Sequence, residues 1–477
     1  MKKIVLCTCL LFILSFGFYF VRVNNKIALI FFAILVFSLG ASILVTTLLN
    51  PIIRLNFLIW AGIVPVLYNS LGALLTISTI NYITWEEYIN YDNTTNEDYC
   101  NALSIIVIYC SCILFLAIFF NAFLQKFTEV FSQDYPKIRN ILLFGLIGIQ
   151  IYLIISGIVS YAGMSNGQTN GNVPIIYAIF NPLFPVVPFL LARKLRSSFG
   201  YIIILLCVFE FFYFLLSGKR MLLNFLLLFF LSYYLKDHFL LFSKKNLLVL
   251  IVSIPIYFIL SNVFMLYNGI RTFNNKSTLT SGFSISGLVE IYKITSDVDK
   301  ELIEESFSRY TSIRAILSLQ PIAIVSYIQR TGGEHLYGKD LINSLKEALP
   351  GNYYVDKNAN LTGEVLYQKE YLGKFNHDDL GNSIPLQGYV DFGIVGVLIY
   401  AIFTGLLLCL LLWLISLVLS KPYYPIGYFA LFLICLNQSE SDVTVLFLFL
   451  RSILLLIFLF FSVKLTRAIA CSTLFSR

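Results

Sequence analysis

Two short charged clusters in this chain carry side chains suited to proton transfer and to anion binding. The first is His377-Asp378-Asp379, in the stretch FNHDDLGNS. A neighbouring carboxylate can orient an imidazole and raise its pKa, which suits a group that accepts and returns a proton. The triplet is equally compatible with an exposed polar loop at a membrane edge, so both interpretations stay open.

The second cluster is Lys219-Arg220, in the tight turn of LLSGKRMLL. An arginine at a helix start offers two parallel donors to a phosphate, and the free N–H groups there add to them. A short turn also needs polar residues of any kind, which is the alternative explanation. Arginine matches phosphate geometry better than lysine, so a further set could clamp a diphosphate together or lie singly on a solvated surface: Arg271, Arg309, Arg314 and Arg330.

The other charged patterns give weaker indications of a functional site. Glu210 and Arg451 fall inside apolar runs, where they predict either an ion pair within the membrane or the lining of a polar cavity. Asp297-Val-Asp299 resembles a metal-binding DxD pattern, but it lies in a predicted helix. The chain has no phosphate-binding P-loop, no HExxH and no GxSxG, and its nine cysteines follow no metal-ligand spacing. We expect neither a metal nor a cofactor.

The elements that must position these groups are membrane helices. Hydrophobic residues make up 58% of the 477 residues, and charged residues only 12%, against about 25% in soluble proteins. The mean hydropathy is +0.82. The chain is therefore an integral membrane protein, and Ile4–Val21 reads as an uncleaved first span because no small-residue cleavage site follows it.

Apolar runs long enough to span a membrane define about twelve helices. They cover residues 4–21, 27–49, 55–80, 102–124, 140–162, 173–192, 199–217, 221–235, 246–266, 389–419, 425–441 and 443–463. The predicted fold is an all-α transmembrane bundle. Its parts are spans one to nine in residues 1–266, a polar segment at 267–388, and spans ten to twelve with a tail in residues 389–477.

Basic residues set the orientation. With the N-terminus inside, 16 lysines and arginines fall in inner segments and four in short outer loops. Both termini are then cytoplasmic, and the polar segment lies outside the cell together with the Lys219-Arg220 turn. The plasma membrane is the expected location.

The outer segment is predicted to be partly helical. SDVDKELIEESFSRYTSIRAILSL places one apolar stripe along a helix, and GKDLINSLKEAL (Gly338–Leu349) predicts a second helix that ends at Pro350-Gly351. Between them, PIAIVSYI is apolar enough to be buried or to lie on the membrane surface. The segment therefore reads as a small folded domain resting on the bundle.

Three stretches of this layout resemble the Wzy-type oligosaccharide repeat-unit polymerases, relatives of the O-antigen ligases. SGKR at 217–220 is similar to a small-residue turn ending in arginine. HLYGKDLINSLKEALP at 335–350 resembles the family's loop helix, and NHDDLGNSIPLQGYVDFGIVG at 376–396 its polar stretch leading into G-x-x-G. His377-Asp378 stands where the ligases usually have His-Asn.

The resemblance implies a GT-C-like fold and a metal-independent glycosyltransferase of the bacterial inner membrane, acting in O-antigen or capsule biosynthesis. The growing glycan would pass from undecaprenyl diphosphate to a lipid-linked repeat unit. Arg220 would stabilise the leaving diphosphate, and His377 or Asp379 would accept a proton. Lys219, Arg271, Arg309, Arg314 and Asp378 would bind substrate. A chain-length regulator is a possible partner; nucleic acid is not. A lipid-linked oligosaccharide flippase and an O-antigen ligase remain alternatives.

Overall fold

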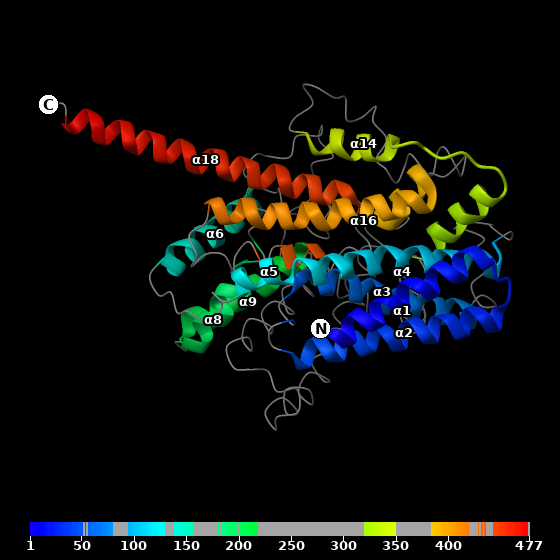
Figure 1. The fold of residues 1–477 in the computed structure, drawn as a ribbon. Coiled ribbons are helices and arrows are strands. Elements are labelled where there is room, and N and C mark those ends of the chain that lie inside the picture. Colours follow the sequence, from blue (N-terminus) through cyan, green and yellow to red (C-terminus); the bar gives the residue numbers. More distant parts are fainter. Residues whose placement is uncertain are drawn as a thin grey trace, which may run out of the picture. The chain divides into compact units, whose positions relative to one another are not determined.

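A computed structural model describes residues 1–50, 53, 56–79, 94–128, 138–156, 180, 184, 186–197, 200–217, 319–349, 383–418, 428, 431–432, 434–435 and 442–475 (Figure 1). Within these ranges the regular structure is entirely helical. The chain divides into two compact units. The first comprises Met1–Gln133, Pro174–Pro182 and Arg314–Arg477, and the second comprises Asp134–Val173 and Leu183–Ile313.

The first unit is built around one helix, α4 (Asn96–Phe119). Its neighbours are α1 (Lys2–Val21), α2 (Lys26–Leu49), α3 (Phe57–Thr79) and α16 (Ile384–Val418). Every side chain of α4 from Asp98 to Ser111 is buried. A helix that is apolar on all sides belongs in a protein core or in lipid, and α4 lies in the core of this unit.

Glycines bring two neighbours close to α4. A side chain at Gly62 of α3 would lie 2.6 Å from Leu114 Cγ, and a side chain at Gly405 of α16 would collide with Leu116. Small residues at such crossings let membrane helices pack backbone to backbone, which replaces the hydrophobic driving force that lipid does not supply. After Phe119 the chain turns and continues as the short helix α5 (Asn121–Thr128).

Residues 319–330 of the predicted outer segment form a further helix in this unit, with Ile322, Ala323, Ile324 and Val325 buried. The predicted second helix is also confirmed: α14 runs Lys339–Ala348, within one residue of the expected bounds. It packs against α16 and against α18 (Val443–Phe475). The helix predicted from the stripe at 296–317 lies outside the described residues.

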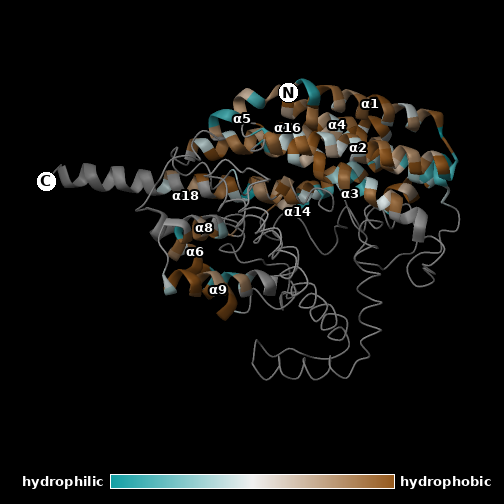
Figure 2. Cartoon of the chain, turned by 90° about the horizontal axis from the view of Figure 1, so that it is seen from below, coloured by the Kyte–Doolittle hydropathy of each residue, from teal (hydrophilic) through white to brown (hydrophobic). Residues whose placement is uncertain are grey.

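Among the described residues, five helices are long and apolar enough to cross a membrane: Lys2–Val21, Lys26–Leu49, Phe57–Leu74, Asn96–Phe119 and Ile384–Leu417 (Figure 2). Shorter apolar helices cover Leu143–Ile155, Tyr201–Phe211 and Val443–Leu455, at three further predicted spans. The protein is therefore a multi-pass membrane protein. The predicted spans 221–235 and 246–266 lie outside the described residues, and 173–192 and 425–441 are described only in part.

Several predicted boundaries were wrong. The span predicted at 102–124 begins at Asn96, because the first turn of α4 holds charged residues that a hydropathy window rejects, and it ends at Phe119. The span predicted at 443–463 continues as helix to Phe475. Within the described part of the span predicted at 173–192, α8 (Val186–Ser197) continues past the predicted end, so the basic residues there are helical rather than in a loop.

The second unit contains α6 (Ile138–Ile155), α8 and α9 (Tyr201–Ser217) among its described residues, with α8 in contact with both others. Gln150 of α6 donates a hydrogen bond of 3.0 Å to the buried carboxyl of Glu210 on α9. This contact gives one hydrogen-bond partner to each of two polar side chains that lie within apolar helices. A buried polar group without a partner costs the most free energy in such surroundings.

Candidate functional site

None of the eight residues predicted to act on substrate lies among the described residues. These are Lys219, Arg220, Arg271, Arg309, Arg314, His377, Asp378 and Asp379. Their roles stay predictions. The described residues nevertheless contain a connected set of polar groups at one end of the first unit, where residues 319–349 pack onto α4, α16 and α18.

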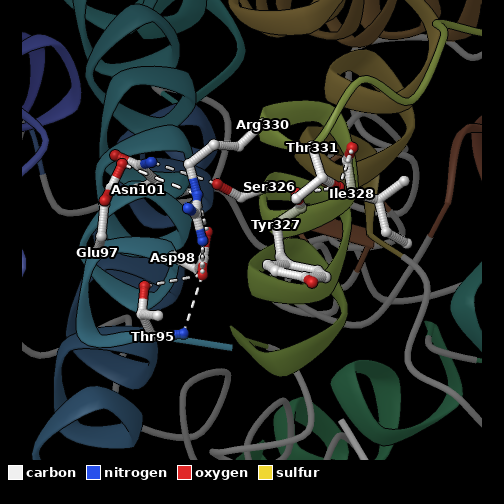
Figure 3. A network of polar contacts seen from close by, with 9 residues as sticks. All are labelled: Thr95, Glu97, Asp98, Asn101, Ser326, Tyr327, Ile328, Arg330 and Thr331. Atoms are coloured by element: carbon white, nitrogen blue, oxygen red, sulfur yellow. Dashed lines mark hydrogen bonds and ion pairs between the residues drawn. The ribbon is translucent and has the colours of Figure 1, made fainter. Parts of the chain in front are cut away.

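The first part of this set is an ion pair between Arg330 and Asp98 (Figure 3). Arg330 Nη2 lies 3.1 Å from Asp98 Oδ2, and Nε lies 3.3 Å from Oδ1, so the guanidinium engages both carboxylate oxygens. Glu97 Oε1 is 3.9 Å from Arg330 Nε. The hydrogen bond with Asp98 raises the pKa of Arg330, and the guanidinium lies 5.4 Å above the ring centre of Tyr327.

Local sequence explains why Asp98 is ready for this partner. Asp98 is in the first turn of α4, and its Oδ2 accepts from the Thr95 backbone N–H at 2.9 Å and the Thr95 hydroxyl at 3.0 Å. This carboxylate is therefore fixed at a helix N-terminus, where negative charge is favoured. One turn on, Asn101 Nδ2 donates to Ser326 Oγ at 3.3 Å, so α4 and the helix at 319–330 are joined twice.

The pairing changes the expectation for Arg330. It was one of four arginines that could bind a diphosphate, but its charge is compensated inside the protein by a fully buried carboxylate. A bidentate pair of this kind holds two elements together. We assign Arg330 to positioning the helix at 319–330 rather than to anion binding.

The second part centres on His335, one of the three histidines. Gln329 Nε2 donates to the Tyr389 carbonyl at 3.0 Å and lies 3.0 Å from His335 Nδ1. The contact with a carbonyl fixes the amide orientation, because a carbonyl oxygen only accepts. His335 Nδ1 is then the accepting nitrogen, and Nε2 carries the ring hydrogen. The ring also lies against Gly393, where a side chain would come within 3.1 Å of Cε1.

The third part is a hairpin at the start of α16. The backbone leaves helical geometry at Phe392 and Gly393, and Gly393 has φ +62°, which favours glycine. The chain reverses there, because a side chain at Gly388 would lie 2.8 Å from the Gly396 carbonyl oxygen, and one at Gly396 would collide with Gly388. Residues eight apart on one straight helix are about 12 Å apart along its axis. The stretch from Ile384 to Asp391 is therefore a short helix folded back on the rest of α16.

The hairpin delivers Asp391 to the N-terminus of α14. Its two carboxylate oxygens accept from the Asp340 and Leu341 backbone N–H groups, each at 3.3 Å, and the Tyr400 hydroxyl donates to Oδ2. The Tyr337 N–H donates to the Asp391 carbonyl at 3.0 Å. These backbone N–H groups have no partner within α14, so Asp391 supplies from another helix what a capping residue usually supplies locally.

Two more contacts tie α14 down along its length. Gln387 Nε2 donates to Ser344 Oγ at 3.2 Å, and its Oε1 accepts from the Val443 N–H at 2.8 Å. Arg451 Nη1 donates to the Ala348 carbonyl at 3.0 Å, near the last turn of α14. A cation is favoured at a helix C-terminus. Thus α14 carries a carboxylate at one end and a guanidinium at the other.

Arg451 and Glu210 therefore have partners that sequence reasoning did not foresee. Arg451 binds a backbone carbonyl of α14, and Glu210 binds Gln150 within the second unit. Sequence reasoning also missed Asp98 and Asp391 as organising residues. Two signals were present: Thr95 stands three residues before Asp98, and Asp391 lies between the aromatic residues Tyr389 and Phe392, directly before G-x-x-G.

Comparison of the chain with protein-family models, with curated proteins and with solved structures found no match. The chemical capacity of the site therefore follows from its own side chains. Asp98 and Arg330 neutralise each other, and Asp391 is committed to α14. Among the described residues of this cluster, His335 contributes an imidazole, whose two ring nitrogens can donate one hydrogen bond and accept another.

Proposed function

We propose that this protein is a polymerase of lipid-linked oligosaccharide repeat units, a metal-independent glycosyltransferase of the bacterial inner membrane. The observation that carries the proposal is the contact between two stretches far apart in the chain. Residues 335–350 and 376–396 both resemble segments of the Wzy-type polymerases. Their described parts meet through Asp391, which accepts from α14, and through the backbone pair Tyr337–Asp391.

In the proposed architecture about twelve spans carry one large outer domain, and both termini are cytoplasmic. The hairpin of α16 and the residues at 319–349 would then line the outer face. The described end of the first unit supports this arrangement, because α4, α16 and α18 all meet the predicted outer segment at their N-terminal ends. Each of these three ends is an outer end in the topology derived from the basic residues.

The proposed reaction is one substitution at an anomeric carbon. A hydroxyl of the incoming lipid-linked repeat unit attacks the anomeric carbon of the growing glycan, and the bond from that carbon to the diphosphate oxygen breaks. The hydroxyl proton passes to His377 or Asp379, and undecaprenyl diphosphate leaves with the bonding electrons. Arg220, helped by Lys219, Arg271, Arg309 and Arg314, stabilises the negative charge on the leaving group, an effect worth a few kcal/mol (about 3).

Deletion of the gene, followed by gel analysis of surface glycan, tests the reaction class. A polymerase loss leaves glycan of a single repeat unit. Polymer that is made but not attached would instead indicate a ligase, and absence of all surface glycan would indicate a flippase. Either of these two results would overturn the proposal.

Complementation with variants tests the residues. Arg220→Ala should abolish long chains, whereas Arg220→Lys should keep part of the activity because it retains the charge but not the two parallel donors. His377→Ala should lower polymer yield by about 100-fold or more if it is the base. His335→Ala is the matched comparison on the same predicted outer segment. Loss with His335→Ala and normal chains with His377→Ala would move the base to His335.

A further inference from the structure

The short helix α14 turns its polar side to the protein and its apolar side outward. Its buried positions are Asp340, Ser344 and Ala348, at spacings of four residues. Ile342 is 53% exposed and Leu345 49% exposed, and Leu349, just beyond the last residue of the helix, is 40% exposed, whereas Leu341 is half-buried. A helix on a water-soluble surface has the opposite arrangement. The outward face of α14 is therefore suited to an apolar environment.

The contacts of α14 show how it runs along its neighbours. Its N-terminus lies at Asp391, beside the turn of the α16 hairpin. One turn further, Ser344 is level with Gln387, which also binds the first residue of α18, Val443. At its end, Ala348 receives the side chain of Arg451, about two turns into α18. The contacts advance in the same direction on both helices, so α14 runs alongside the start of α18 (Figure 1).

The start of α18 is itself apolar and exposed on one side. Val443–Leu455 is an apolar helix, and Val445 and Leu454 are exposed large hydrophobic residues on it. In α16 the same is true of Val395, Ile399 and Leu406. The two helices that α14 packs against therefore both carry exposed apolar side chains, which is the kind of surface that lipid hydrocarbon covers in a membrane protein.

Backbone groups at both ends of α14 also have hydrogen-bond partners within the protein. Backbone groups in the hydrocarbon region must be satisfied within the protein. Asp391 accepts from two N–H groups at the N-terminus, and Arg451 donates to a carbonyl at the C-terminus. Lys339 and Lys346 lie on the flank beside the apolar face, and long lysine stems can reach the headgroup level while their helix is inserted.

We propose that α14 is a re-entrant helix, inserted at a slant into the bilayer with Tyr337 nearest the surface and Leu349 deepest. Its Ile342, Leu345 and Leu349 side chains contact the hydrocarbon chains of bilayer lipids. Leu349 lies seven residues beyond Ile342, so it can be deeper by up to about 10 Å. The proposal does not depend on the protein being a polymerase.

Depth measurement by spin labelling tests the insertion. The full chain without native cysteines, carrying Ile342→Cys, Leu345→Cys or Leu349→Cys, is labelled with a nitroxide and reconstituted in phosphatidylcholine–phosphatidylglycerol vesicles. Collision with oxygen should exceed collision with a water-soluble nickel chelate at all three positions. The ratio should rise from residue 342 to residue 349. Leu406→Cys, exposed on α16, is the lipid control, and Thr331→Cys is the aqueous control.

Three outcomes would overturn the proposal. Equal ratios at the three positions indicate a helix lying flat on the surface. Frequent collision of the labels with the nickel chelate indicates that these residues face water. Rare collision with both oxygen and the chelate indicates that protein covers them, from this chain or a second copy. If the cysteine-free chain does not fold, Leu345→Trp is introduced into the native chain and reconstituted with brominated phospholipids. The quenching of its tryptophan fluorescence is compared with that of the native chain, which has three tryptophans. Quenching no greater than in the native chain would then overturn it.

Discussion

Two places in the first unit bring charges to the ends of membrane helices, and they compensate those charges differently. At the start of α4, the Asp98 carboxylate meets the Arg330 guanidinium, a pair of full charges. At α14, the charges of Asp391 and Arg451 meet backbone N–H and C=O groups at the two ends of a helix. In the first case one side chain suffices. In the second, the Tyr400 hydroxyl supplies one donor to Asp391, but the backbone partners of Asp391 and Arg451 are in place only while α14 is helical, so these contacts of α16 and α18 and the folding of α14 depend on each other.

The largest effect is expected at the ion pair. Arg330→Met leaves the buried Asp98 carboxylate without a cation, which costs about 3–5 kcal/mol when both partners are buried. Because the Arg330 side chain is 29% exposed and Thr95 still donates to Asp98, the loss should fall at the low end, about 3 kcal/mol. Thermal unfolding in detergent should show a clear drop in midpoint.

The double variant Asp98→Asn, Arg330→Met separates charge from packing. It should recover part of the loss, since no uncompensated charge remains. If the two single losses simply add, the ion pair is not the link between α4 and the helix at 319–330.

A smaller effect is expected at the N-terminus of α14. Asp391→Ala removes an acceptor for two N–H groups and should destabilise α14 by about 1–2 kcal/mol. The readout is local: trypsin cleavage after Lys346 should accelerate by about 10-fold, because proteolysis follows the population of the opened helix. Asp391→Asn keeps an acceptor, so its cleavage rate should lie between those of the unchanged protein and of Asp391→Ala. An unchanged cleavage rate with Asp391→Ala would show that α14 does not depend on this carboxylate.

The smallest effect is expected at the other end. Arg451→Met removes one hydrogen bond, from Nη1 to the Ala348 carbonyl, and the loss should be about 1 kcal/mol. Trypsin cleavage after Lys346 should accelerate less than with Asp391→Ala. Equal acceleration by both variants would mean that α14 opens as one piece whichever end is released.

Sequence reasoning predicted the membrane helices that the described residues contain, and the bounds of α14 to within one residue. Hydropathy summed over a segment indicates a membrane helix, and Pro350-Gly351 is a local signal for the end of a helix. Both features could therefore be predicted directly from the sequence. The reversal of the chain at Phe392 could not be predicted in this way. The apolar run continues through it, and hydropathy does not register the direction of the chain; only Gly388, Gly393 and Gly396 hint at it.

The polar cluster was harder to predict for a different reason. Asp98 and Arg330 are 232 residues apart, and Asp391 and Asp340 are 51 apart. No periodicity links residues at such distances. Arg451 shows the same limit: its apolar surroundings predicted a polar partner, but a carbonyl at the end of a helix has no side chain to mark it in the sequence.

The separation between Asp98 and Arg330 also has a consequence for synthesis. At about 5–20 residues per second, the ribosome needs roughly 12–46 seconds to travel from Asp98 to Arg330. During that interval α4 has been made but lacks the cation for its buried carboxylate. The face of α4 that receives α16 stays uncovered even longer, because Ile384 follows later still. The nascent chain must therefore keep its central helix near the translocon, or with its charged first turn in water, until the second half of the protein arrives to enclose it.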